Sequence, residues 1–201
     1  MCIRDSLNPA ALLRRGPHRK ANLMTIVLCL LLLNAALGTI DTLWFHEYKA
    51  QLPSQLTHTR TELILHTARD FLYTTVYGVF AWWTPSGLWV AIFGLILSAE
   101  IVITLTDFVV EDRDRPAIGG IAPGERVLHT LMAIVYGATL ANLLPVLADT
   151  AFEATALTRH GARPILSWAA TAMAVGIALT GVRDFLAVLG LDVLRPIQTE
   201  A

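Results

Sequence analysis

The sequence contains one short phrase twice, as Glu62-Leu-Ile-Leu-His66 and as Glu125-Arg-Val-Leu-His129. In a helix, the four-residue spacing places the carboxylate and the imidazole on the same face. Each phrase begins an apolar run, and a charged side chain inside a membrane normally faces a partner, a cavity or an ion. We therefore expect the two phrases to supply ligands to a metal centre.

A second acidic pattern lies between the two phrases. Glu100, Thr104, Asp107 and Glu111 recur at i, i+4, i+7 and i+11, which aligns them on one helical face. Crowded carboxylates repel one another and take up protons, and a divalent cation removes that conflict. We expect Glu100 and Asp107 to be ligands, whereas Glu111 and Asp112 could equally be solvated charges at the helix end.

A third pair, Asp41 and His46, precedes the first phrase. Residues five apart lie about 140° from each other on a regular α-helix, so both reach one centre only if the helix frays there. Dimetal centres in four-helix bundles use a Glu from each of two helices and a Glu-x2-His from each of the other two. This chain matches those roles but not that spacing. The predicted metal ligands are Glu62, His66, Glu125, His129, Glu100, Asp107, Asp41 and His46.

Carboxylate and imidazole ligands suit iron or manganese, and zinc is also compatible. The only cysteines are Cys2 and Cys29, which gives no thiolate site and no disulfide framework. We expect iron.

The tetrapeptide Arg-Asp-Phe-Leu also occurs twice, beginning at Arg69 and at Arg183. In each copy we expect the arginine and the adjacent aspartate to neutralise each other locally. We therefore assign neither copy to the metal centre.

The composition indicates an integral membrane protein. The 201 residues are 55% hydrophobic and 15% charged, with a net charge of -1, whereas soluble domains are about 25% charged. Neither the charge nor any motif suggests nucleic-acid binding. A membrane-spanning helix needs about 20 apolar residues, and five windows qualify: 23–45, 62–83, 87–110, 126–148 and 165–190.

These windows predict an all-α membrane bundle of five transmembrane helices over residues 23–190, with a C-terminal tail at 191–201. The first four helices form two similar hairpins, because each pair carries an Asp, a further acid or His-acid pair, a loop and then Glu-x3-His. In an up-and-down bundle, all the predicted ligands except the deeper Glu100 then fall near one membrane side.

The N-terminus affects the expected orientation. Met1-Cys-Ile-Arg-Asp-Ser6 resembles a translated sequencing adapter, and Met24 stands where the first apolar run begins. We therefore expect residues 1–22 to be an artefactual extension. Counted from Met24, the positive-inside rule places the metal site on the cytoplasmic side of a bacterial inner membrane. If the basic residues before Met24 belong to the protein, the same rule reverses this orientation.

Between Asp41 and Pro145 the chain resembles a group of small bacterial membrane proteins. The resemblance lies in four phrases: Asp41-Thr-Leu-Trp-Phe-His46-Glu47, Glu62-x3-His66, Asp107-Phe-Val-Val-Glu111-Asp112 and Glu125-Arg-x2-His129. Some members of this group are encoded beside, or joined to, short-chain-dehydrogenase-like epimerases. The resemblance implies that the four phrases act as a unit, and it implies no particular reaction.

We interpret the chain as a dimetal oxidoreductase acting on a lipid-phase substrate such as an acyl chain, an isoprenoid or a quinol, with a redox partner supplying electrons. Three alternatives stay open. One is a haem-binding electron carrier with His66 and His129, or His46, as axial ligands. The others are a metal or proton transporter and a zinc hydrolase.

Overall fold

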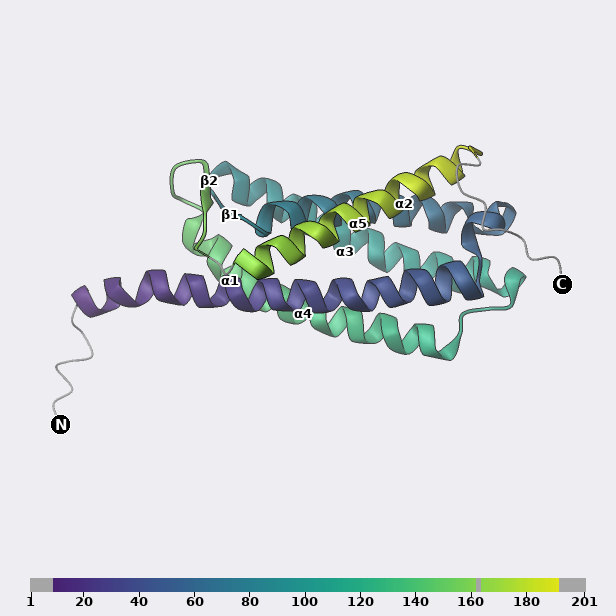
Figure 1. The fold of residues 1–201 in the computed structure, drawn as a ribbon, viewed down its shortest axis with the longest axis horizontal. Coiled ribbons are helices and arrows are strands. Elements are labelled where there is room, and N and C mark those ends of the chain that lie inside the picture. The colour runs from purple at the N-terminus through teal and green to yellow at the C-terminus, as the bar shows by residue number, and fades with distance from the viewer. Residues whose placement is uncertain (1–8, 162–163, 192–201) are drawn as a thin grey trace.

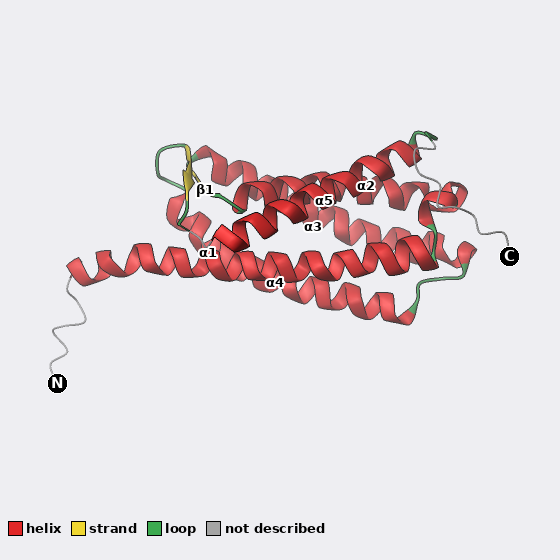
Figure 2. Ribbon diagram, in the orientation of Figure 1, coloured by secondary structure: helices red, strands yellow, loops and turns green. Residues whose placement is uncertain are grey.

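The structure is a computed structural model that describes residues 9–161 and 164–191. Five long helices run up and down in one bundle (Figure 1), and nearly all of the described chain is helical (Figure 2). The long helices are α1 (Pro9–Ile40), α2 (Leu56–Phe80), α3 (Leu88–Asp114), α4 (Pro123–Thr150) and α5 (Pro164–Val188). The short elements are η2 (Asp41–Lys49), η3 (Leu52–Ser54), η4 (Arg115–Ile118), β1 (Trp83–Ser86) and β2 (Ala156–Arg159).

Each of the five predicted windows coincides with one of the long helices, which confirms the all-α architecture. Helix α1 begins at Pro9 and runs without interruption past the expected boundary at residue 22. Residues 1–8 of the expected extension, and all of the expected tail except Leu191, lie outside the described residues. The expected domain boundaries therefore stay predictions.

Four helical segments are long and apolar enough to cross a membrane. They are Arg19–Lys49, Leu88–Ile118, Pro123–Thr150 and Pro164–Val188. Helix α2, which we expected to be a fifth span over 62–83, is not among them. The physical reason is the charge carried by α2, where Glu62, Arg69 and Asp70 lower the hydropathy. By length and composition, the described chain has four candidate spans and one more polar long helix.

The helices close into a ring in which each packs against two neighbours, in the order α1, α4, α3, α2, α5 and back to α1. Each helix contributes to a common hydrophobic core, as Leu31, Tyr77, Phe93, Val146 and Ala174 illustrate. The buried Tyr77 hydroxyl donates to the carbonyl of Leu31 at 2.6 Å, which satisfies both groups within the core. In this ring, helix α5 packs against both α1 and α2, so it lies between the two helices of the first expected hairpin.

A two-stranded antiparallel sheet of β1 and β2 closes one end of the bundle, where we expected only turns. Gly87, directly after β1, has a φ of +58°, which favours glycine. A Cβ there would also lie 2.6 Å from Thr155 Oγ1, so only glycine fits. At the opposite end, α1 and α3 finish while α2 and α4 begin (Figure 1). The alternating direction of the helices thus gathers the predicted ligands at one end.

Candidate metal centre

The polar end of the bundle contains a buried cluster of carboxylates and imidazoles, drawn from η2, α2, α3 and α4. All are buried except His129, which is partly buried. Its members are Asp41, His46, Glu62, His66, Asp107, Glu111, Glu125 and His129. Seven of these eight residues are predicted ligands, and Glu111 is the addition.

Asp41 and His46 converge because the chain between them is not an α-helix. Residues Asp41–Lys49 form a π-helix, which directly continues α1. Its backbone hydrogen bonds join residues five apart, which brings such residues to the same side of the helix. His46 Nε2 consequently lies 3.5 Å from Asp41 Oδ2. The expected obstacle, an angle of about 140° on a regular helix, is removed by this local change of helix type rather than by fraying.

The two Glu-x3-His phrases are linked by reciprocal contacts between the two halves of the sequence. His129 Nε2 of the second phrase lies 3.0 Å from Asp41 Oδ2. His66 Nε2 of the first phrase lies 3.0 Å from Asp107 Oδ2. Each half therefore provides the aspartate that faces the histidine of the other half.

Two sets of potential ligand atoms are close enough to hold an ion, since the atoms within each set all lie within 4.8 Å of one another. They overlap at His46, whose ring stacks on that of His66 with centroids 4.7 Å apart. Each set also contains the glutamate and the histidine of one phrase. The first set is Asp41, His46, Glu125 and His129, and the second is His46, Glu62, His66 and Glu111.

A buried guanidinium joins the two glutamates. Arg115, from η4, is 1% exposed, and its Nε and Nη2 donate to both oxygens of Glu62 at 2.7–3.0 Å. The same Nη2 donates to Glu125 Oε1 at 3.0 Å. Glu125 also accepts a hydrogen bond from the backbone N–H of Ala122 at 3.3 Å, as expected for an acid in the first helical turn. Arg115 thus links the glutamates of the two phrases.

The charges of the cluster do not balance. Five carboxylates face two guanidinium groups, Arg115 and Arg69, and Arg69 donates to Asp107 Oδ2 at 3.0 Å. With neutral imidazoles, three negative charges remain in excess. The expected local pairing of Arg69 with Asp70 is wrong, because Arg69 bonds to Asp107 and Asp70 accepts from Thr180. Divalent cations, or protons on the imidazoles, would offset the excess.

Several buried ligand atoms have no hydrogen-bond partner, which is unusual for buried polar groups. His66 Nε2 is one of them, because its 3.0 Å contact with Asp107 lacks hydrogen-bond geometry. The unpartnered atoms of the cluster's acids and imidazoles are Asp41 Oδ1, His46 Nε2, His66 Nε2, Asp107 Oδ1 and Glu111 Oε1. Imidazole nitrogens and carboxylate oxygens of this kind are suitable donors to a metal ion.

Two predicted ligands, Asp107 and Glu100, belong to neither set. Asp107 contacts His66 within the cluster, whereas Glu100 lies farther away. It stands seven residues before Asp107, about 10 Å along α3. Its Oε1 accepts hydrogen bonds from the Tyr73 hydroxyl at 2.5 Å and from the Thr104 hydroxyl at 3.0 Å. The structure therefore places this predicted ligand in a separate polar contact deeper in the bundle.

Sequence reasoning missed the roles of Arg115 and Arg69 and left Glu111 open. The position of Glu111 on the acidic face of α3 was a usable signal, and the structure directs its Oε2 towards His129 Nδ1 at 3.5 Å. The adjacent Asp112 is exposed and pairs with Arg126. No sequence signal separates Arg115 from the exposed Arg113 two residues earlier.

The imidazole geometry bears on the haem alternative. His46 and His66 stack nearly parallel, at 14°, with face against face. Axial haem ligands instead direct one ring nitrogen each at an iron between them. The stacked arrangement therefore favours individual metal ions over a porphyrin at this pair.

No protein-family model, no curated protein and no solved structure matches the chain. The chain is therefore characterised by its own structure. It is a helical protein with four candidate membrane spans among the described residues and a buried cluster of carboxylates and histidines that could hold a metal ion.

Proposed function

We propose that the chain is a membrane-embedded dimetal oxidoreductase, with iron as the metal and a lipid-phase substrate. The observation that carries this proposal is the pair of buried ligand sets, which overlap at His46 and contain one Glu-x3-His phrase each. The excess of negative charge in the cluster adds to it, because two divalent cations would offset that charge in an otherwise apolar bundle.

The ligand chemistry supports iron. Within the described residues, the two sets offer only carboxylate and imidazole donors, a combination that also occurs in the dimetal centres of four-helix bundles. Iron bound in this way would supply one-electron and oxygen chemistry. The protein itself would orient the donors through Arg115 and Arg69, while Leu52 and Leu63 limit the access of water to the imidazoles.

The membrane setting supports a lipid-phase substrate with an electron-donating partner. Helices that are exposed and apolar along their length would let an acyl chain, an isoprenoid or a quinol approach from the bilayer. When only the basic residues from Met24 onwards are counted, the positive-inside rule supports a centre on the cytoplasmic side of a bacterial inner membrane, and we propose this orientation.

Elemental analysis of the purified protein tests this proposal. Detergent-solubilised protein is loaded with Fe²⁺ under argon, exposed to air, desalted and measured for iron, together with its absorption spectrum. We expect about two iron ions per chain, one for each ligand set with the shared His46 bound to one of them, and an absorption band of oxidised diiron. A preparation that remains free of iron after loading would refute the proposal.

Two adjacent acids on α3 provide a matched control. Glu111 is buried beside His129, whereas the side chain of Asp112 is 61% exposed. We expect Glu111→Gln to lower the iron content and Asp112→Asn to leave it unchanged. Equal losses in both variants would indicate a nonspecific effect of surface charge.

Transport of a metal ion is the second candidate function, and a specific observation favours it. A small pocket that opens beside the centre is lined by the acids Glu47, Asp70 and Asp184. Reconstitution into vesicles separates the two functions: an oxidoreductase turns over substrate without net flux, whereas a transporter moves the ion across the vesicle membrane without turnover.

A further inference from the structure

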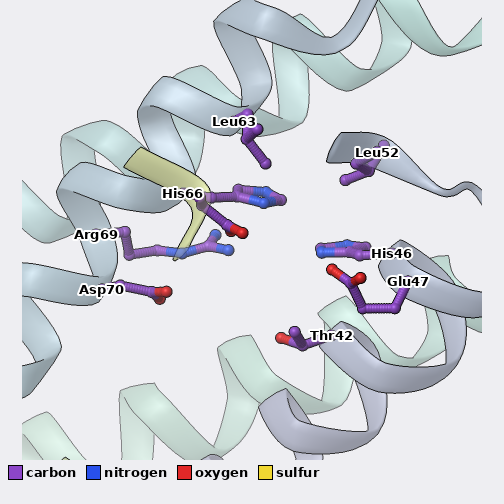
Figure 3. A pocket seen from close by; sticks show the side chains of 9 residues that line it. Thr42, His46, Glu47, Leu52, Leu63, His66, Arg69 and Asp70 are labelled. Carbon is purple, nitrogen blue, oxygen red and sulfur yellow. The ribbon is translucent and has the colours of Figure 1, made fainter. Parts of the chain in front are cut away.

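A small pocket reaches the candidate metal centre between η2, α2 and α5 (Figure 3). The imidazoles of His46 and His66 project into it from opposite sides, and Leu52 and Leu63 lie along one edge. Both imidazoles are at least nine-tenths buried and have an unpartnered Nε2. The pocket therefore leads directly to free donor atoms of the ligand set that contains His66.

Three carboxylates, together with Thr42 and Arg69, make up the rest of the pocket lining. The carboxylates are Glu47 from η2, Asp70 from α2 and Asp184 from α5. Carboxylate oxygens attract hydrated divalent cations and can replace part of their hydration shell. The guanidinium of Arg69, which also lines the pocket, is paired with Asp107, so its positive charge is offset there. The wall is thus suited to a cation on its way to the imidazoles.

One ion pair joins two of the elements that line this pocket, η2 and α5. Arg183 of α5 donates to Glu47 of η2, and it also donates to Asp184 through Nε at 3.0 Å and Nη2 at 2.6 Å. The side chains of Arg183 and Glu47 are 25% and 24% exposed, so the pair lies at the boundary between solvent and protein. Because solvent reaches this pair, water can replace its contacts when it opens.

The pocket does not reach His129, the histidine of the second phrase, although the side chain of His129 is 12% exposed and that of His66 is 5% exposed. The ring of Phe108 stacks on His129 with centroids 5.4 Å apart, and neither residue lines the pocket. The pocket therefore leads to the side of the centre that carries His66.

We propose that this pocket is the route by which a divalent cation reaches the centre, and that the ion pair between Arg183 and Glu47 closes it. This inference rests on the proposed metal centre. Breaking the pair removes a link between α5 and η2 and leaves the wall carboxylates free to receive the ion. Because Arg183 is not a ligand, its removal changes how fast the ion enters and leaves and does not change how tightly the ion is held.

Stopped-flow loading with Co²⁺ tests the inference in the full-length, detergent-solubilised chain, with the visible absorption of bound cobalt as the signal. For Arg183→Gln we expect the loading and release rates to rise together by about tenfold, the effect of removing a barrier of about 1.4 kcal/mol. The dissociation constant stays within about twofold. Arg126→Gln, which removes an exposed arginine at the same end of the bundle, is the matched control and should leave the rates unchanged.

A reversible crosslink provides a second test that does not depend on removing charge. With Glu47→Cys and Arg183→Cys together, a thiol-reactive crosslinker that contains a reducible disulfide should slow cobalt loading at least tenfold, and reduction should restore it. The native chain, treated with the same crosslinker, controls for Cys2 and Cys29.

The outcomes separate this inference from the proposed function. Cobalt binding at the same rate in the native chain, in Arg183→Gln and in both states of the crosslinked variant would overturn the access route and leave the metal centre intact. A changed dissociation constant with unchanged loading rates would also overturn it. Absence of cobalt binding in every variant would overturn both proposals.

Discussion

The two Glu-x3-His phrases have the same spacing but different surroundings. Glu62 and His66 lie on α2, and His66 borders the pocket. Glu125 lies in the first turn of α4, bonded to a backbone N–H, and His129 is covered by Phe108. The difference teaches that a repeated phrase can supply equivalent ligands to one centre while the two positions differ in access.

The preceding segments differ in a second way. In the first half, Asp41 and His46 are five apart on a π-helix, whereas in the second half Asp107 and Glu111 are four apart on an α-helix. Each arrangement places its two side chains on one side of the backbone. Helix type therefore compensates for one residue of spacing.

The largest expected effect comes from the residue that joins both phrases. Arg115→Gln should destabilise the metal-free protein by about 3–5 kcal/mol, because it leaves Glu62 and Glu125 buried without their cation. Reversible denaturation in mixed micelles measures the free energy of unfolding. Added divalent metal should recover much of the loss, since it supplies positive charge to the same carboxylates. The exposed Arg113→Gln serves as the control.

The next effect compares the two phrases directly. Glu62→Gln and Glu125→Gln should each lower the metal content by about half, and the double variant should bind almost none, because each glutamate belongs to a different ligand set. Metal content per chain, measured after desalting, decides this. If one variant lost all the metal while the other lost none, the centre would be mononuclear.

A deletion tests the comparison of helix types. Leu43 lies between Asp41 and His46, and its side chain is 60% exposed. Removing it gives these two residues the spacing of Asp107 and Glu111, so a regular α-helix should replace the π-helix and metal affinity should stay within about tenfold. Isothermal titration with Zn²⁺ measures that affinity. Complete loss of binding would show that the π-helix itself is required.

The smallest effect concerns the half that carries His129. Phe108→Leu removes the stacking on His129 but keeps an apolar side chain, so we expect a cost of about 0.5–1.5 kcal/mol in unfolding free energy. Metal release from this half should become faster while the total metal content is unchanged. Release kinetics into a chelator provide the measurement, and an unchanged rate would contradict the idea that Phe108 encloses the site.

Much of the fold and the general position of the site follow from the sequence. Apolar runs of membrane-spanning length, separated by Pro and Gly, predict the five helices, and their alternating direction brings the heads of α2 and α4 to one end. The small sheet of β1 and β2 was not predictable in this way, because its four-residue strands pair across 70 residues of sequence. The charged residues of α2 indicate its lower hydropathy, but the length of its apolar run led to the prediction of a fifth membrane span.

What the sequence by itself determined is the set of ligand types and the helix faces that carry them, because helical spacing fixes which side chains share a face. Only the tertiary structure decided which of those residues meet. Glu111 joins the cluster and Glu100 bonds to Tyr73 instead, although both lie on the acidic face of α3. The difference arises from depth along the helix and from how α2 and α4 pack beside it. The same packing brings Arg115 of η4 between the two glutamates, so the charge balance of the centre depends on contacts between distant segments.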